Sequence, residues 1–252
     1  MILLFYAFAR EIAPFKRHLE NCPPLEHRDL RGFRTARGKT EILAIATGMG
    51  LAHARRAALR AFELYPDARL AIATGVAGAL TDGLVPGDLV LADRVMVQHD
   101  PVTEPEHLMT IEGQLLRKLG RRLEAAGLRF TSGAMLSSPR VLSRGGEKRL
   151  AGKKTGAIAV DMETASIAEQ ANARGIDFTC LRAIIDQVDE EVVGATLTDP
   201  AGEVSVLAAT TYLLRNPGEL LKLPRMIANL NRATRSLAAG LEAILPGETR
   251  RT

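Results

Sequence analysis

The strongest constraint on the fold is an alternation along the chain between short apolar runs and longer segments with helical spacing. The short runs are rich in Ile, Val and Leu, whereas apolar residues of the longer segments recur every three to four positions. This pattern is typical of a sheet covered by helices on both faces, so we predict an α/β fold with three α/β/α layers. The expected strands lie near 2–8, 29–36, 40–47, 69–75, 88–97, 128–136, 156–161 and 177–185, and the expected helices near 10–20, 51–64, 111–126, 162–174, 201–213 and 217–244.

One segment indicates that the central sheet is mixed rather than wholly parallel. The stretch RDLRGFRTARGKTEILAIAT holds two predicted strands that are separated by Gly38 and Lys39. So short a connection fits an antiparallel hairpin, since parallel neighbours need a long crossover.

The length and the apolar content favour a single soluble domain. The chain has 252 residues, of which 46% are hydrophobic, and no linker or repeat divides it. We therefore expect one domain over residues 1–252, with a C-terminal amphipathic helical extension at about 213–245. The N-terminal MILLFYAFAR has no basic region before its short apolar run, so it is expected to be a buried strand rather than a signal peptide. The expected location is the cytoplasm.

Charge and cysteine usage exclude several classes of function. The net charge of +4 comes from scattered arginines, and aromatic residues are only 4% of the chain, so no nucleic-acid surface is expected. Cys22 and Cys180 lack the spacing of a zinc site or a disulfide framework. No metal and no cofactor are expected.

Two glycine-rich stretches are candidate walls of a binding pocket. ATGMGLAHA (46–54) and ATGVAGAL (73–80) each follow an apolar run, and we expect both to be turns. Ligands of open α/β sheets bind at the carboxyl ends of strands, where glycine lets the backbone come close. Thr74, Gly75 and Val76 are therefore candidate substrate-binding residues, although a turn between elements also needs glycine for geometry alone.

The stretch AVDMETASIAEQ (159–170) places Asp161 and Glu163 where a helix is expected to begin. Acids in a first helical turn stabilise the helix N-terminus by about 0.3–1 kcal/mol each. We favour that structural account for Asp161. Glu163 needs a further explanation, because Met162 precedes it and a second acidic motif follows downstream.

Four segments occur in a fixed order: AFAREIAPF, ATGVAGALTDGLVPGDLVLAD, AVDMETASIAE and CLRAIIDQVDEE. In this order they resemble the nucleoside phosphorylase and nucleosidase superfamily, and most of all the methylthioadenosine/S-adenosylhomocysteine nucleosidases. The resemblance runs from residue 2 to about residue 190. It implies a small-molecule nucleoside as the substrate and a homodimer or larger homo-oligomer as the assembly.

The resemblance implies a role for each acidic residue. Glu163 holds the ribose hydroxyls, because a carboxylate accepts from two neighbouring hydroxyls at once, and Met162 packs on the sugar. Asp186 protonates the purine so that it can leave. Glu11 activates the attacking water, and Arg182 orients it. The implied reaction cleaves the N-glycosidic bond of an adenine nucleoside by water, with acid and base work shared as in glycoside hydrolysis.

Phosphate is the alternative acceptor. Phosphorylases of this superfamily carry an Arg and a Ser or Thr where this chain has Ala73 and Val76, and these are strong oxyanion ligands. Their loss favours hydrolysis, yet nucleosidases also have Ser at the place of Val76. The sequence leaves open that Arg10, Arg55 or Arg140 binds phosphate instead.

The base-binding segment SSPRVLS (137–143) also departs from the family. Aligned with the nucleosidase segment that contacts adenine, this segment has Val141, beside Leu142, in place of an aromatic residue. Without a stacking ring a strict adenine preference is weakened, although backbone contacts from both residues would survive.

The C-terminal region carries its own alternatives. Leu223, Ile227, Leu230, Leu237, Leu241 and Leu245 share one face at helical spacing, and Lys222, Arg225, Asn229 and Arg232 share another. We expect the apolar face to close the core or to contact another subunit. The alternative is a peripheral membrane contact for a lipid-linked substrate, as in hopanoid-associated phosphorylase-like proteins that release adenine from adenosyl-hopane. A nucleoside-binding module without catalysis is the non-enzymatic alternative.

Overall fold

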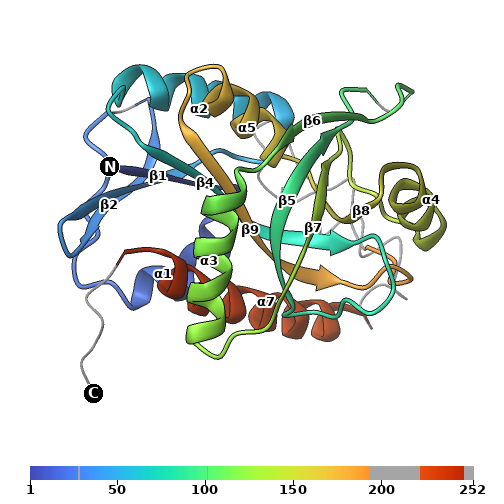
Figure 1. Ribbon diagram of the computed structural model, residues 1–252. Helices are drawn as coiled ribbons and strands as arrows, with labels where there is room; N and C mark the ends of the chain where they lie inside the picture. Colours follow the sequence, from blue (N-terminus) through green and yellow to red (C-terminus); the bar gives the residue numbers. More distant parts are fainter. Residues whose placement is uncertain (28, 101, 193–221, 247–252) are drawn as a thin grey trace, which may run out of the picture.

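A mixed β-sheet forms the middle layer of the molecule (Figure 1). The computed structural model describes residues 1–27, 29–100, 102–192 and 222–246. Within these residues, nine strands run in the order β2-β3-β1-β4-β8-β7-β5-β6, and β9 pairs with both β4 and β5. The strands are β1 (Ile2–Tyr6), β2 (Arg31–Arg37), β3 (Thr40–Ala46), β4 (Leu70–Ala79), β5 (Leu89–Val97), β6 (Glu106–Thr110), β7 (Phe130–Ser137), β8 (Ala157–Asp161) and β9 (Asp177–Asp186).

Helices cover both faces of this sheet, which confirms the predicted three-layer α/β/α fold (Figure 1). Strand β1 is buried throughout, and its side chains alternate between two apolar clusters: Leu3 and Phe5 face one, and Leu4 faces the other. One cluster is completed by α2 (Leu51–Leu64) and α5 (Thr164–Asn172). The other is completed by α1 (Ala9–Arg17), α3 (Gly113–Ala125) and α7 (Leu223–Ile244).

The predicted hairpin is confirmed. Strands β2 and β3 pair antiparallel, and Gly38 at their turn has a φ of 56°, which favours glycine. Strand β3 then pairs parallel with β1, so the sheet is mixed as expected.

The second glycine-rich stretch is not a turn, and that prediction was wrong. Strand β4 continues through it to Ala79, with a register shift between Ala77 and Gly78. Glycine inside a strand marks a place where another group comes close to the backbone. The side chains that come close to this strand are described with the site below.

Two elements were missed by the sequence reasoning. Strand β6 is short and lies at the edge of the sheet, next to β5. Helix α4 (Gly145–Thr155) begins with two glycines, and its sequence has no apolar stripe, so it contributes few buried residues. Helical periodicity of apolar residues therefore could not reveal it. The predicted helix at 201–213 and the first residues of the extension at 213–245 lie outside the described residues.

Helix α7 packs against the sheet with an apolar face that includes Leu237 and Leu241. Its C-terminal turn is held by Arg122, whose Nη1 donates to the carbonyl of Ile244 at 2.6 Å. Two details of the predicted faces were wrong: Ile227 is 47% exposed, and Asn229 is buried. The buried face supports the core-closing account of this helix. Among the described residues, no helix is long and apolar enough to span a membrane.

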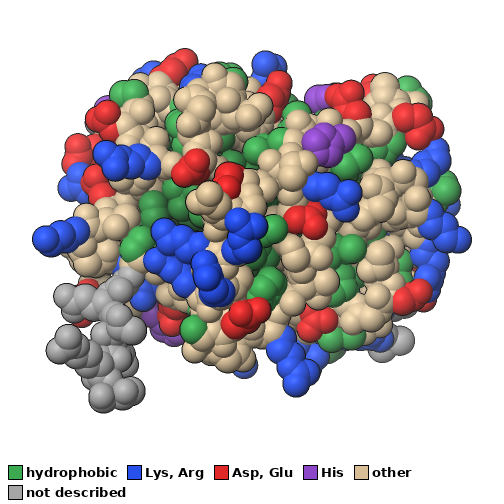
Figure 2. All heavy atoms as spheres, in the orientation of Figure 1, with side chains coloured by type: hydrophobic (Ala, Val, Ile, Leu, Met, Phe, Trp, Pro, Cys, Tyr) green, Lys and Arg blue, Asp and Glu red, His purple; other side chains and the backbone are tan. Residues whose placement is uncertain are grey.

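Charged side chains of both signs are interspersed over the face drawn in Figure 2. The densest basic group on this face lies over α3, whose sequence contains Arg117, Lys118, Arg121 and Arg122. On this face no basic stripe follows the length of the molecule.

Candidate active site

A cavity of about 180 Å³ opens where the carboxyl ends of β1, β8 and β9 meet the C-terminal half of β4. Strands β1 and β9 both run parallel to β4, so their carboxyl ends come together at this edge. The cavity is lined by Ala7, Phe8, Glu11, Met49, Val76, Ala77, Gly78, Arg140, Val141, Leu142, Val160, Asp161, Met162, Glu163, Ile185, Asp186 and Val192.

Most of the predicted site residues meet in this cavity, although they come from five parts of the chain. Those that line it are Glu11, Val76, Val141, Leu142, Met162, Glu163 and Asp186. Three others do not line it. The side chain of Arg182 is only 1% exposed and lies behind the acids, and Thr74 is turned away, donating from Oγ1 to the Leu181 carbonyl at 3.0 Å. Gly75 adjoins the acids from within β4.

Glu11 is held by three backbone donors. Its Oε2 accepts from the N–H groups of Ala7 at 2.9 Å and Phe8 at 3.0 Å, and its Oε1 accepts from Val76 at 3.0 Å. The bond from Phe8 is half of a helix-capping arrangement, because Glu11 lies in the first turn of α1. A carboxylate has about four acceptor positions, so one remains on Oε1. Burial raises the pKa of Glu11, while Arg182 and the three N–H groups lower it.

Glu163 stands at the junction between β8 and α5. Its Oε1 accepts from the N–H of Gly50 at 2.8 Å, so the first glycine-rich stretch does form a pocket wall as predicted. Its Oε2 lies 3.7 Å from Nη2 of Arg182. Burial and the neighbouring charge of Asp161 raise the pKa of Glu163. Oε2 also accepts from the N–H of Met162 at 3.4 Å, so both oxygens of the carboxyl group are held at the cavity wall.

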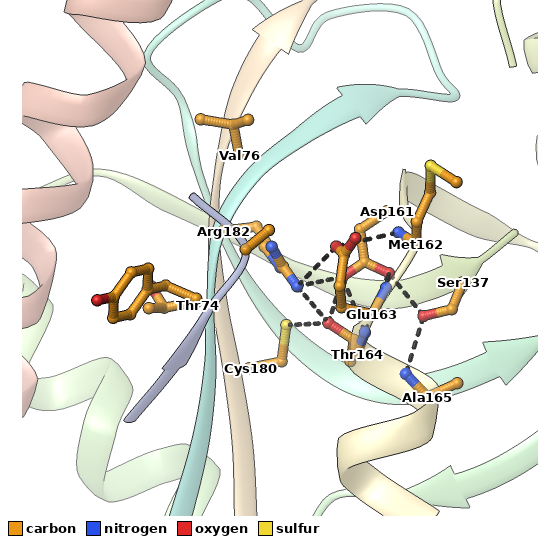
Figure 3. Close-up of polar contacts among 12 residues, drawn as sticks. Thr74, Val76, Ser137, Asp161, Met162, Glu163, Thr164, Ala165, Cys180 and Arg182 are labelled. Carbon is orange, nitrogen blue, oxygen red and sulfur yellow. Dashed lines mark hydrogen bonds and ion pairs between the residues drawn. The ribbon is translucent and has the colours of Figure 1, made fainter. Parts of the chain in front are cut away.

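Arg182 is the centre of the polar network in Figure 3. Its Nη2 lies 2.5 Å from Oδ2 of Asp161 and donates to Oγ1 of Thr164 at 3.1 Å. Asp161 also accepts from the N–H of Thr164 at 3.2 Å at the start of α5, and from Oγ of Ser137 at 2.6 Å. Stabilising the start of α5 is therefore only part of the role of Asp161, because its carboxylate also forms a buried ion pair with Arg182.

The other side of the Arg182 guanidinium faces the backbone of β4. Its Nε and Nη1 are buried and have no hydrogen-bond partner among the residues that the structure describes. A Cβ atom on Gly75 would lie 2.5 Å from Nη1 and 2.7 Å from Oε1 of Glu11. Only glycine, here with a φ of 140°, leaves room for these two groups side by side. The segment that was wrongly predicted to be a turn is therefore a strand, and Gly75 within it leaves space for Glu11 and Arg182.

Asp186 ends β9 on the opposite side of the cavity and forms an ion pair with Lys148 of α4. Burial raises the pKa of Asp186 to about 6, against the lowering effect of Lys148. Lys148 is fully buried and was missed by the sequence reasoning, because an isolated Lys in a segment where no helix was expected gives no signal of burial.

The remaining wall is mostly apolar. Val141, Leu142 and Met49 line it, and Phe8 supplies an aromatic ring from the segment of Glu11, although sequence reasoning did not single out Phe8. Of the three arginines considered for phosphate, only Arg140 lines the cavity, and its guanidinium lies 3.3 Å from Glu147. Cys22 and Cys180 are free thiols, and the described residues contain no cluster of three or more His, Cys, Asp or Glu able to hold a metal.

Comparisons with known proteins agree with this geometry. The sequence pattern of the Phosphorylase superfamily matches residues 2–211. The 5′-methylthioadenosine/S-adenosylhomocysteine nucleosidase of Chromohalobacter salexigens is 24% identical over 208 residues, which are 75% of this chain and 86% of that protein.

Solved structures share the fold at lower identity. The corresponding nucleosidase of Helicobacter pylori aligns with a TM-score of 0.74 at 18% identity, covering 96% of each chain. Futalosine hydrolase of the same organism aligns with a TM-score of 0.74 at 17% identity, also over 96% of each chain. The S-adenosylhomocysteine nucleosidase of Streptococcus pyogenes aligns with a TM-score of 0.71 at 19% identity over 97% of each chain.

Proposed function

The chain belongs to the Phosphorylase superfamily, and from that premise we propose that it cleaves the N-glycosidic bond of a purine nucleoside by water. One observation carries the proposal: Glu11, Glu163 and Asp186 converge on a single cavity, and burial raises the pKa of each. Carboxyl groups with raised pKa values can exchange protons near neutral pH. The named nucleosidase relatives, which act on adenine nucleosides, support the substrate class.

The three carboxyl groups divide the work of the reaction. Asp186 gives its proton to the purine while the bond from the sugar to the base breaks, and the bonding electrons leave with the base. Glu11 takes a proton from water, whose oxygen bonds to the sugar carbon that carries a developing positive charge. Glu163 accepts hydrogen bonds from the ribose hydroxyls, with Met162 against the sugar. The products are the free base and an unphosphorylated sugar.

Arg182 acts in this scheme through its neighbours. It is buried behind Glu11 and Glu163 and pairs with Asp161, so it fixes the two acids at the cavity wall. Two of its nitrogens, Nε and Nη1, have no partner among the described residues, and Nη1 lies on the side nearest Gly75 and Glu11. We therefore assign it a positioning role, with a bond to the nucleophile as a role to be tested.

Phosphate as the acceptor is the second candidate, and Arg140 in the cavity wall favours it. Against it, Ala73 is buried without a polar side chain, and Val76 presents no hydroxyl to the cavity. Binding of a dianion would also require Arg140 to loosen its pair with Glu147. The residues that line the cavity therefore fit water better than phosphate as the acceptor of the sugar.

The direct test is an assay with purified protein, in which the base and sugar products are identified by mass. Methylthioadenosine, adenosine, inosine and an adenosyl-lipid are each incubated with and without phosphate. We expect free adenine and unphosphorylated sugar without phosphate. Ribose 1-phosphate formed only with phosphate would replace hydrolysis by phosphorolysis, and Arg140→Met would then abolish it. Cleavage of the adenosyl-lipid alone would assign a lipid-linked substrate, and tight nucleoside binding without any product would indicate a binding module.

A further inference from the structure

Lys148 is a buried cation next to Asp186, the residue proposed to protonate the purine base. It comes from helix α4, and none of its surface is exposed. Its Nζ donates to Oδ1 of Asp186, to the carbonyl of Gln187 at 2.9 Å and to the carbonyl of Glu190 at 2.8 Å. An ammonium group has three donors, so all of them are used.

The contact leaves the second oxygen of Asp186 for a ligand. Lys148 occupies Oδ1, and none of the hydrogen bonds among the described residues goes to Oδ2. Asp186 lies against the backbone of Gly78, where a Cβ would come within 3.1 Å of Oδ1. The carboxyl group is thus fixed between α4 and β4, with Oδ2 as its free acceptor or donor.

The charge of Lys148 has a consequence for proton transfer. Burial favours the neutral form of Asp186, and the nearby ammonium favours the carboxylate. Once Asp186 has given up its proton, a buried carboxylate remains, and an unpaired buried charge is strongly unfavourable. Lys148 is already in contact with that carboxylate before the reaction begins.

We propose that Lys148 is a positioning residue for Asp186, holding Oδ2 toward the base and stabilising the carboxylate formed when Asp186 protonates the leaving purine. The proposal rests on the proposed function and adds a residue to it. In the step, the Asp186 O–H bond breaks and a bond from hydrogen to the purine nitrogen forms. The proton goes to the base, the negative charge stays on Asp186, and Lys148 keeps all of its own protons.

The test compares neutral and charged replacements of Lys148. Lys148→Gln keeps two N–H donors for the carbonyls of Gln187 and Glu190 but removes the charge. We expect roughly a 10-fold or larger fall in kcat with a smaller change in KM. Because the ammonium lowers the pKa of Asp186, its loss moves the alkaline limb of kcat/KM to higher pH. Lys148→Arg keeps the charge, and its limb is expected to stay closer to that of the natural protein.

A matched control lies on the same helix. Arg149 is 38% exposed and pairs with Asp82 and Asp189 at the surface. Arg149→Gln removes one positive charge from α4 but none from the cavity, so its pH profile should stay unchanged. An equal shift in Arg149→Gln would show a general charge effect and overturn the proposal.

A double variant separates positioning from a purely structural role. If Lys148 acts through Asp186, adding Lys148→Gln to Asp186→Asn should lower the residual activity little further. If Lys148 only fastens the turn at 187–190, its effect persists in that background and the pH limb of the single variant does not move. Either of these results overturns the proposal.

An independent readout does not require catalysis. The pKa of Asp186 can be followed by carbon NMR of its labelled side chain in the natural protein and in Lys148→Gln, and it should rise in the variant. Thermal unfolding confirms that each variant is folded, and Lys148→Met replaces Lys148→Gln if the latter is not. Absence of product from the natural protein would refute the proposed function, whereas an unchanged Asp186 pKa would refute the role of Lys148.

Discussion

The guanidinium of Arg182 lies 2.5 Å from the carboxylate of Asp161, and the side chain of each is only 1% exposed. Asp161 ends β8 and Arg182 lies in β9, so the pair joins two strands that do not pair with each other (Figure 3). The pair also brings one positive charge beside Glu11 and Glu163, two buried acids. Stability and the shape of the active site therefore depend on the same contact.

The first prediction concerns that pair. Asp161→Asn leaves the buried Arg182 without its main counter-charge, and breaking a buried pair costs about 3–5 kcal/mol. We expect a loss of this size in the free energy of unfolding, measured with urea. Asp82→Asn, which removes a surface partner of Arg149, should lower the free energy of unfolding far less, because water and salt screen an exposed pair. Equal losses in the free energy of unfolding of the two variants would contradict a larger contribution of the buried pair between Asp161 and Arg182.

The second prediction concerns Gly75. A methyl group there would press on Nη1 of Arg182 and Oε1 of Glu11, so Gly75→Ala must displace at least one of them. We expect kcat to fall by roughly 100-fold, as a misplacement of about 1 Å can cause. Gly127→Ala is the control, since its φ of 70° is also positive but its Cβ would meet nothing within 4 Å. Normal turnover by folded Gly75→Ala would contradict the geometry described here.

The third prediction concerns the missing hydroxyl at Val76. The backbone of Val76 already donates to Glu11, and its side chain lines the cavity. Val76→Ser would place a hydrogen-bonding group beside the water that Glu11 is proposed to activate. One added bond contributes about 0.5–1.5 kcal/mol, so kcat should rise roughly 2- to 10-fold without phosphate. Val76→Ala provides the control for volume, and a rise of the same size in that variant would remove the hydroxyl as the cause.

The fourth prediction concerns Glu163. Loss of a hydrogen bond that Glu163 is proposed to make to ribose should raise KM in Glu163→Gln by roughly 2- to 10-fold, from about 0.5–1.5 kcal/mol. Its pKa is raised on folding, so the folded protein binds a proton that the unfolded chain has lost, and stability falls as pH rises above the ordinary value of 4.5. Glu163→Gln removes this fall. Its melting temperature relative to the natural protein should therefore increase between pH 5 and pH 8, and a constant difference would refute the role of ionisation.

The fifth prediction is the pH dependence of catalysis. In the proposed mechanism Asp186 acts in its protonated form, and its pKa is raised to about 6, so kcat/KM should decline as pH rises beyond that value. The same mechanism requires Glu11 in its ionised form, so activity should also decline at low pH, below a pKa raised by burial. Asp186→Asn should lower kcat by roughly 100- to 10,000-fold, change KM far less and abolish the alkaline limb. Near-normal turnover in this variant would refute the acid role.

The predictions from sequence succeeded where the signal was local. The apolar periodicity identified β1, the hairpin at Gly38 and the alternation that gives three layers. The predictions failed for α4, which has no apolar stripe, and for the end of β4, where the glycines indicated a turn. The glycines serve contacts with residues far along the chain, and no local pattern reveals those partners.

The sequence by itself therefore determined the fold class, the family resemblance and which acids could do chemistry, because each depends on residue type and spacing within short segments. Only the tertiary structure decided how those acids are charged and oriented. Burial beside Arg182 and Lys148 arises from strands and a helix that are distant in the sequence. The pKa of a carboxyl group depends on the water and charges around it, and these are set by packing rather than by neighbours in the chain.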